Sequence, residues 1–456
     1  GLLPKEPRGL YGRFLAPRGM TGKVSATFID QRRTYYKATA GALGESDNAW
    51  TEFYLPFSAF VCSQSEKGKG LQLGMVGAGD TLEITVGDVL GDSPILFEGL
   101  RFVGGTNEEA AVSRRLHRVA VRRALLPEES LPPRRPRLLM TPERLARVQA
   151  KVKTSPEAKA VYEAFLREAE RILKTYPAEY PAESILRFRA QGEVNPHQWS
   201  GQLEGAVTAS VIPIETLAAA YQFTGDERYG RFAAKALAGM ARDVDADTPM
   251  LNKGFYYTRT FYVRALAFGY DWLWPLFTPE ERPEGKATLL GFVETIHRDC
   301  WEMTWGNRPL RRVWNWTPGL ASCAGLGVLA LEGETRIGEK AILFDLRRYL
   351  RDYLTLGLDP DGCGHEGPSY FAYGIGAGPQ FLECLREQGR GDLFEDTNLK
   401  LIAPWIVSEI LPDGSRWNNL SDCSYGASPA AVYSYVCGRL SEQSRPGILG
   451  TARYPD

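Results

Sequence analysis

The chain has 456 residues, of which 44% are hydrophobic and 24% charged, a composition that is typical of a globular protein and excludes wholesale disorder. Its 54 basic and 55 acidic residues leave a net charge of −1, which argues against a strongly basic nucleic-acid-binding protein or an acidic tail protein. No apolar run reaches the roughly 18 residues that a membrane-spanning helix needs. The length predicts two to three domains.

Residues 1–105 are predicted to form a β-rich accessory domain. Residues that favour strands cluster or alternate at Lys23–Ile29, Trp50–Phe57, Leu82–Val86 and Pro94–Val103, and Gly, Asp and Ser turns separate these stretches. Seven or so short strands with regular turns indicate a β-sandwich, which resembles the jelly-roll-like modules of carbohydrate enzymes. A likeness of this kind concerns the fold and assigns no function.

Residues 106–137 are predicted to connect two domains. Five arginines lie between Arg114 and Arg123, and a proline-rich stretch follows at Leu131–Pro136. Many sites that bind single-stranded nucleic acid have aromatic residues among the basic ones, and this segment has none between its arginines. The segment therefore reads as a solvated helix followed by a charged, proline-rich linker.

Residues 138–456 are predicted to be helical. A helix opens at Thr141-Pro-Glu-Arg, where a threonine cap precedes a proline at the first helical position. Amphipathic helices are expected at Ala158–Thr175, Pro213–Phe223, Asp226–Val244, Thr258–Trp274, Glu284–Trp305, Thr317–Glu332, Glu339–Leu356, Gly376–Gln388 and Asn398–Ile410. Successive helical hairpins joined by short loops indicate an (α/α) toroid or solenoid, and the lack of a strict sequence period disfavours TPR and HEAT arrays.

The stretch from Leu358 to Tyr373 is the first candidate for a functional site. A helix is expected to end near Leu356, and a Gly-rich turn segment then brings together His365, Glu366, Tyr370 and Tyr373. Titratable groups on a loop at a helix end are a common way for a helical scaffold to build a site.

A second candidate surrounds Asn315 at the start of a small-residue helix. Trp314 and Trp316 flank this asparagine, and Arg312 precedes them. An asparagine amide has both donors and an acceptor, so it can bind a carboxylate or a carbonyl without adding charge. The alternative is a helix cap with packed indoles.

Three further polar, aromatic segments lie next to predicted helices. Each is a weaker signal on its own. The segment Asn195–Glu204 contributes His197, Gln198 and Glu204. The segment Asn252–Arg259 contributes Tyr257 and Arg259, and the segment Asp413–Asp422 contributes Trp417 and Asn418.

Residues 141 to about 440 resemble the heparinase II/III-like and alginate-lyase-like polysaccharide lyases, which have an α/α toroid. The motifs that carry this resemblance are PDGxxxEGPSYxxYG at Pro360–Gly374, Asn-Trp at Trp314–Trp316 and Tyr-Asp-Trp-Leu at Tyr270–Leu273. The resemblance implies that Tyr370 acts in catalysis. It also places Trp314 where the family usually has a histidine that neutralises the substrate carboxylate. Larger members carry a C-terminal β domain that can donate a further histidine, and we expect that part to be absent from a chain that ends at Asp456.

Uronate chemistry explains why such residues are needed. A lyase removes the proton at C5 of the sugar, next to the carboxylate, so donors must neutralise that carboxylate as enolate character develops. Asn315 suits this role, with His197, Gln198 or Arg312 as helpers. Tyr370 then serves as base and acid in a syn elimination if its pKa is lowered, because a phenol of pKa near 10 is a poor base at pH 7. His365 is the alternative base, and His117 and His297 are expected to be structural.

The sequence therefore predicts a polysaccharide lyase that acts on an acidic, uronate-containing polysaccharide and is secreted or periplasmic, as its substrate class requires. We expect no cofactor, with a structural calcium ion as an open alternative, and no nucleic-acid partner or membrane span. The residues expected to bind substrate are Trp314, Trp316, Arg312, Gln198, Glu204, Tyr257, Arg259, Glu366, Tyr373, Trp417 and Asn418.

Three alternatives remain open at this stage. An inverting glycoside hydrolase on the same toroid would need two carboxylates about 6.5–9.5 Å apart, such as Glu366 with Asp422 or with Glu204. A uronate C5-epimerase would share the proton abstraction but return a proton from the other face. A non-catalytic glycan-binding protein would fit if Trp314 marks a lost site.

Overall fold

The computed structural model describes residues 7–17, 20–29, 35–43, 46, 50–62, 81–90, 95–104, 135–180, 196–243, 258–279, 281–305, 313–335, 339–410 and 430–442. The chain divides into two compact units, Gly1–Ala120 and Val121–Asp456, and each unit is described by itself. Of the predicted linker 106–137, only residues 135–137 are described.

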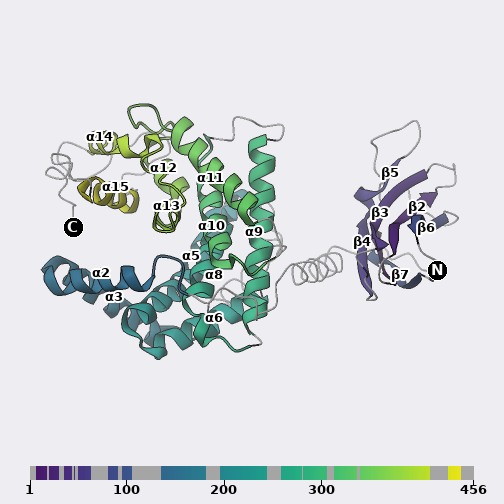
Figure 1. The fold of residues 1–456 in the computed structure, drawn as a ribbon, viewed down its shortest axis with the longest axis horizontal. Coiled ribbons are helices and arrows are strands. Elements are labelled where there is room, and N and C mark those ends of the chain that lie inside the picture. The colour runs from purple at the N-terminus through teal and green to yellow at the C-terminus, as the bar shows by residue number, and fades with distance from the viewer. Residues whose placement is uncertain are drawn as a thin grey trace. The chain divides into compact units, whose positions relative to one another are not determined.

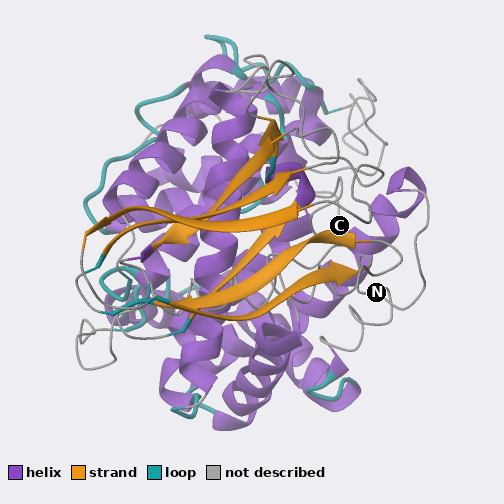
Figure 2. Cartoon of the chain, turned by 90° about the vertical axis from the view of Figure 1, so that its right-hand side faces the viewer, coloured by secondary structure: helices purple, strands orange, loops and turns teal. Residues whose placement is uncertain are grey.

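The first unit contains two antiparallel sheets (Figures 1 and 2). One sheet has the order β4-β1-β7 and the other the order β5-β3-β2-β6. The strands are β1 Pro7–Leu15, β2 Thr21–Ile29, β3 Tyr35–Ala42, β4 Thr51–Pro56, β5 Val61–Cys62, β6 Thr81–Leu90 and β7 Leu96–Gly104. All four predicted strand regions are confirmed, and β1, β3 and β5 are additions that the sequence analysis did not single out.

Side chains from both sheets form one buried hydrophobic cluster. In β4, Thr51, Phe53 and Leu55 are buried while the residues between them are half-buried, which is the period of two that a strand requires. The cluster joins Phe14 of one sheet to residues such as Phe28 of the other. The first unit is therefore held together by the hydrophobic effect across both sheets.

The second unit is helical. Its α-helices are α2 Pro142–Thr154, α3 Pro156–Thr175, α5 Pro196–Thr224, α6 Glu227–Asp243, α8 Thr258–Trp272, α9 Glu281–Trp305, α10 Trp316–Leu331, α11 Glu339–Leu356, α12 Gly367–Ile375, α13 Gly378–Glu387, α14 Ile402–Ser408 and α15 Ala430–Glu442. Short 3₁₀ turns occur at Trp274–Leu276 and Asn398–Leu401. None of the described helices is long and apolar enough to cross a membrane.

Several helix boundaries follow from local capping. The Thr141 hydroxyl accepts a hydrogen bond from the Arg144 backbone N–H at 3.3 Å, and Ser155 does the same for Ala158 at 3.2 Å. A proline occupies the first turn of both helices, where its missing N–H costs nothing. These local signals explain why α2 begins where the sequence predicts and why α3 begins at Pro156, two residues before the predicted Ala158.

The helices α5, α8 and α10 run parallel to one another. Gln222 near the end of α5 donates to the Trp272 carbonyl at the end of α8, and Tyr270 of α8 donates to Glu334 just past the end of α10. Between them, α9 returns antiparallel to α8, because Tyr262 contacts Phe292 while Gly285 lies by Tyr270. The N-terminal ends of α5, α8 and α10 therefore point toward the same end of the unit.

The helix α10 is the centre of this unit. Every residue from Thr317 to Leu331 is buried. At Gly325 a side chain would collide with the Phe381 ring of α13, so the glycine permits this close approach.

Three helix predictions are corrected by the structure. The helix expected at Pro213–Phe223 begins at Pro196 and continues through Pro213. The helix expected at Gly376–Gln388 is α13, and Gly376, with φ of 37°, ends α12. The segment expected at Asn398–Ile410 is a 3₁₀ turn followed by the short helix α14.

Candidate functional site

A partly buried hydrogen bond joins the start of α10 to the start of α12. The Asn315 side chain, 3% exposed, donates from Nδ2 to Glu366 Oε1 at 2.9 Å. Asn315 precedes α10 in the capping position, but its side chain makes no hydrogen bond to the helix backbone. The amide is therefore directed at Glu366 and does not cap α10, which removes the alternative of a simple helix cap.

The face of α12 that contacts Asn315 also carries Tyr370. A Cβ atom at Gly374 would lie 2.5 Å from the Asn315 carbonyl oxygen, so only glycine lets the two backbones approach this closely. Glu366, Tyr370 and Gly374 are spaced four residues apart, and such residues share one face of a helix. Tyr370 consequently lies between two points at which α12 contacts Asn315.

The prediction that Tyr370 and Tyr373 lie on a loop is wrong. The turn segment after α11 ends at Glu366, and Tyr370 and Tyr373 belong to the helix α12. Pro368 lies in the first turn of that helix, where it favours helix initiation. A helix holds a phenol more rigidly than a loop does, which suits a group that must meet a substrate atom.

The Asn315–Glu366 pair has unused hydrogen-bonding capacity. Asn315 Oδ1 and Glu366 Oε2 are buried and have no hydrogen-bond partner among the residues that the structure describes. Burial raises the pKa of Glu366, and the hydrogen bonds from Asn315 oppose this rise. Unsatisfied buried polar atoms are costly, so this pair is a natural place for a polar ligand group.

His365 lies on the exposed turn that leads into α12. Its Nε2 is 2.7 Å from Asp359 Oδ1, and both side chains are nearly half exposed. Gly362, with φ of 90°, and a backbone hydrogen bond from Asp359 to the Cys363 carbonyl close the turn. A carboxylate that engages one ring nitrogen fixes the orientation of the imidazole and leaves Nδ1 for other partners.

Two tryptophans flank Asn315. The Trp314 and Trp316 rings stack with centroids 4.3 Å apart and an interplanar angle of 20°. Both are half-buried and pack against the helical core. Their stacking supports the backbone on either side of Asn315, and their partial exposure leaves room for a contact with a ligand.

Arg259 lies in the interior at the start of α8. Its side chain is 1% exposed at the residue level and forms a close ion pair with Asp299 of α9. Contact with a substrate, which the sequence predicts for Arg259, would require this pair to open. His297, expected to be structural, is half-buried on α9 and bonds Asp345 at 3.0 Å.

The remaining predicted residues lie outside the described parts of the site. The first turns of α5 contain three of them, whose side chains the structure does not describe: His197, Gln198 and Glu204. Four others lie outside the described residues: Tyr257, Arg312, Trp417 and Asn418. So do Asp422, which the hydrolase alternative invokes, and His117, which was expected to be structural.

Sequence reasoning missed two residues of this site, Asp359 and Gly374. The signal for Asp359 was its place in a tight Asp-Pro-Asp-Gly turn six residues before His365. The signal for Gly374 was its spacing of eight residues from Glu366, but that spacing has meaning only once the segment is known to be helical.

Within the described residues, no group of three or more His, Cys, Asp or Glu side chains is placed to hold a metal ion. In comparisons with known proteins, neither a protein-family model nor a curated protein sequence matches the chain.

Proposed function

We propose that this protein is a polysaccharide lyase that cleaves a uronate-containing polysaccharide by β-elimination. The observation that carries the proposal is the partly buried Asn315–Glu366 pair, which lies on the same face of α12 as Tyr370. The parallel helices α5, α8 and α10, with antiparallel returns between them, are consistent with an α/α toroid, and the shared core of the two sheets is consistent with a jelly-roll-like β-sandwich.

The Asn315–Glu366 pair supplies the means to neutralise a carboxylate. Because burial raises the pKa of Glu366, the carboxyl group holds its proton to a higher pH than an exposed glutamate does. Because Oε1 accepts from Asn315, a protonated Glu366 would carry its proton on Oε2 and could donate it to the substrate carboxylate. That hydrogen bond strengthens as negative charge builds up on the carboxylate in the transition state.

In this proposal, Tyr370 transfers the protons of the reaction. As a phenolate it removes the C5 proton, the C4–O4 bond breaks, and a double bond forms between C4 and C5. The phenol then gives its proton to the departing O4 oxygen, so the tyrosine returns to its starting state. His365, oriented by Asp359, is the alternative base.

One observation also favours a second candidate, an inverting glycoside hydrolase. A carboxyl group with a raised pKa, such as that of Glu366, suits a general acid that protonates a glycosidic oxygen. Asp422 or Glu204 would then have to act as the base that activates water. We prefer the lyase because the bond from Asn315 directs Glu366 toward a carboxylate-binding role.

An ultraviolet assay tests the proposed function. The protein is incubated with a panel of uronate polysaccharides, including heparan sulfate, chondroitin, hyaluronan and alginate, and the absorbance of a conjugated unsaturated uronate is followed. The proposal predicts such absorbance with at least one polymer, and a loss of about 10²-fold or more in Tyr370→Phe.

Tyr162→Phe is the matched control, because Tyr162 of α3 packs against Phe223 near the C-terminal end of α5 and has no part in the site. New reducing ends without absorbance would favour the hydrolase. Exchange of the C5 hydrogen without cleavage would indicate the epimerase, and binding without either reaction would indicate a glycan-binding protein.

A further inference from the structure

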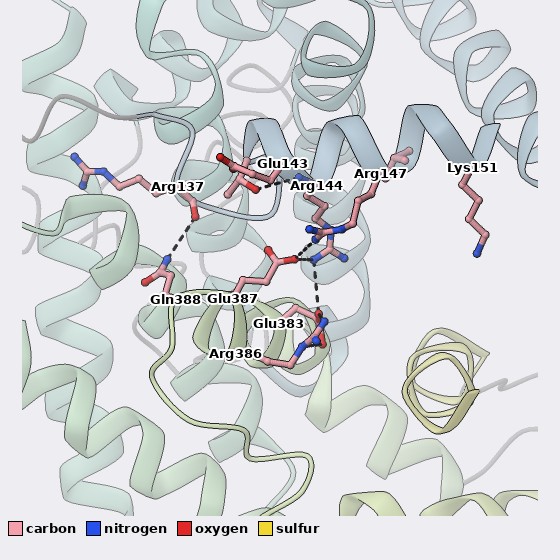
Figure 3. A pocket seen from close by; sticks show the side chains of 11 residues that line it. Arg137, Glu143, Arg144, Arg147, Lys151, Glu383, Arg386, Glu387 and Gln388 are labelled. Carbon is pink, nitrogen blue, oxygen red and sulfur yellow. Dashed lines mark hydrogen bonds and ion pairs between the residues drawn. The ribbon is translucent and has the colours of Figure 1, made fainter. Parts of the chain in front are cut away.

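A groove of about 830 Å³ lies between α2 and α13 (Figure 3). Five basic and three acidic side chains line it. Its volume is within the roughly 300–1,000 Å³ of small-molecule sites, but its lining is far more highly charged than the apolar lining usual there. A groove of this kind suits a polar, charged ligand.

The basic residues of α2 form a row along one side of the groove. Arg144, Arg147 and Lys151 are spaced three and four residues apart, so they share one face of the helix. Figure 3 shows their side chains extending from α2 toward the side on which α13 lies. The row is therefore built into the helix and faces the groove.

The carboxylates of α13 only partly neutralise this row. Glu387 accepts from both Arg144, at 3.1 Å, and Arg147, at 2.9 Å, and Arg144 also pairs with Glu383 at 3.7 Å. Glu383 in turn accepts from Arg386 at 2.6 Å and from Arg439 at 3.2 Å, so the guanidinium groups around these two carboxylates outnumber them. Each guanidinium has five N–H donors, and within the described residues Arg144 and Arg147 each use one of them in a side-chain hydrogen bond, to Glu387.

Lys151 completes the row at its outer end. No carboxylate of the described residues lies within ion-pair distance of its ammonium group, and its side chain is exposed. Arg147 is also largely exposed, at 64% of its side chain. The outer part of the groove thus presents an unpaired ammonium beside a partly used guanidinium, which is the combination that binds carboxylate and sulfate groups.

This groove is separate from the site at Asn315. Arg137, which lines it, donates to the carbonyl of Glu332 at the C-terminal end of α10, whereas Asn315 precedes the N-terminal end of that helix. The 16 residues of α10 span about 24 Å at 1.5 Å per residue. A ligand in the groove therefore lies near the opposite end of α10 from the Asn315–Glu366 pair.

We propose that the groove between α2 and α13 is a second binding site for an acidic oligosaccharide, whose carboxylate or sulfate groups lie on Arg147 and Lys151. The proposal does not depend on the elimination reaction, because binding here can be measured without turnover. Carboxylate and sulfate share the required chemistry, and the probes below distinguish them.

The test is fluorescence anisotropy with three labelled probes. These are a sulfated hexasaccharide from heparin, an unsulfated hexagalacturonate and the neutral cellohexaose. We expect one or both acidic probes to bind the full chain and the neutral probe not to bind. Raising the salt from about 0.1 to 1 M shortens the Debye length from about 10 to 3 Å and should weaken that binding.

Two charge reversals on the same helix locate the binding site. Lys151→Glu is expected to weaken the binding of the acidic probe about fivefold or more. Lys153→Glu makes the same change two residues away, on the other face of α2 and outside the groove, and should leave the affinity unchanged. Both residues are exposed, so neither variant should impair folding.

Arg147→Gln provides a second variant and should also weaken the binding of the acidic probe. Equal effects of the Lys151 and Lys153 reversals would overturn the proposal, because they would indicate a general charge effect. Failure of both acidic probes to bind the wild-type chain would overturn it as well. Preference for the sulfated over the unsulfated probe would assign the anion as sulfate, and the reverse would assign it as carboxylate.

Discussion

The protonation state of Glu366 decides what the pair with Asn315 can do. A charged carboxylate would repel a uronate, whereas a protonated carboxyl donates a hydrogen bond to it. Burial favours the protonated form and raises the pKa of this group. The same residue thus links the stability of the fold to the chemistry of the candidate site.

The raised pKa predicts how stability depends on pH. A carboxyl group whose pKa is higher in the folded state contributes stability that is fully present below its unfolded pKa and is lost as the pH rises through its folded pKa. Wild type should therefore lose stability relative to Glu366→Gln as the pH rises from about 4 to 7. Urea unfolding of both proteins across this range measures the difference, and a difference independent of pH would contradict the raised pKa.

Activity should separate two substitutions of the same residue. Glu366→Gln keeps a neutral donor at this position, so we expect it to retain activity within about tenfold of wild type, while Glu366→Ala loses about 10²-fold or more. Turnover of the most active polysaccharide, followed by ultraviolet absorbance, compares the two. Equal losses in both variants would show that a proton-donating group at this position is not what the reaction needs.

At the scale of elements, the site depends on how α12 lies against the start of α10. Gly374 makes this contact possible, because a Cβ atom there would lie 2.5 Å from the Asn315 carbonyl oxygen. Since Tyr370 is on the same face of α12, any shift of the helix moves the phenol relative to Asn315.

Gly374→Ala should therefore displace α12 and impair both activity and stability. We expect a loss of about 1–3 kcal/mol in the free energy of unfolding, which is typical of overpacking, and a fall in activity of about tenfold or more. Gly239→Ala in α6 is the matched control. A Cβ atom at Gly239 would lie 3.8 Å from the flexible end of the Arg242 side chain and near nothing else described. This variant should therefore raise the free energy of unfolding by about 0.5–1 kcal/mol. A Gly374→Ala protein as active as wild type would contradict the close approach.

The sequence predicted the elements with strong local signals. Glu339–Leu356 has both bounds as predicted, because its apolar residues follow the helical period throughout. The tight Asp-Pro-Asp-Gly turn was also clear. The extension of α5 to Pro196 was missed because Pro213 looks like a helix start, and only neighbouring helices show that the chain continues through it.

The candidate site was less predictable than the fold. His365, Glu366, Tyr370 and Asn315 were selected as candidates, but the bond between Asn315 and Glu366 joins residues 51 positions apart. A contact between residues so far apart in the sequence is set by tertiary packing, which the local pattern of a single sequence does not reveal. For the same reason, the sequence did not reveal that Arg259 pairs with Asp299 in the interior.

At the scale of the whole molecule, a buried cluster of charges fixes the start of the helical unit. Glu334, whose side chain is fully buried, accepts hydrogen bonds from Tyr270 at 2.6 Å and from Arg137 at 3.1 Å, and pairs closely with Arg135. Asp271 accepts from the backbone N–H groups of Arg137 and Leu138 at 2.7 and 2.8 Å. The segment that enters the unit is thus tied to α8 and α10.

Removing one charge from this cluster should destabilise the helical unit strongly. We expect Glu334→Gln to lower the free energy of unfolding by about 3–5 kcal/mol, because it removes the carboxylate with which Arg137 pairs and leaves Arg135 with Asp271 alone. Glu168→Gln, which removes an exposed partner of Arg171, should cost at most about 1 kcal/mol. Urea unfolding followed by the helical circular dichroism signal compares the two, and similar small effects would contradict a structural role of the cluster.

The central claim is that cleavage occurs by elimination at the Asn315–Glu366–Tyr370 site. The most direct measurement is the mass of the products formed in water enriched in oxygen-18. Elimination predicts one new end that is lighter by one water than a hydrolysis product, no incorporation of the label, and loss of this product in Tyr370→Phe. Products that carry the label and lack the unsaturated end would contradict the account and establish hydrolysis.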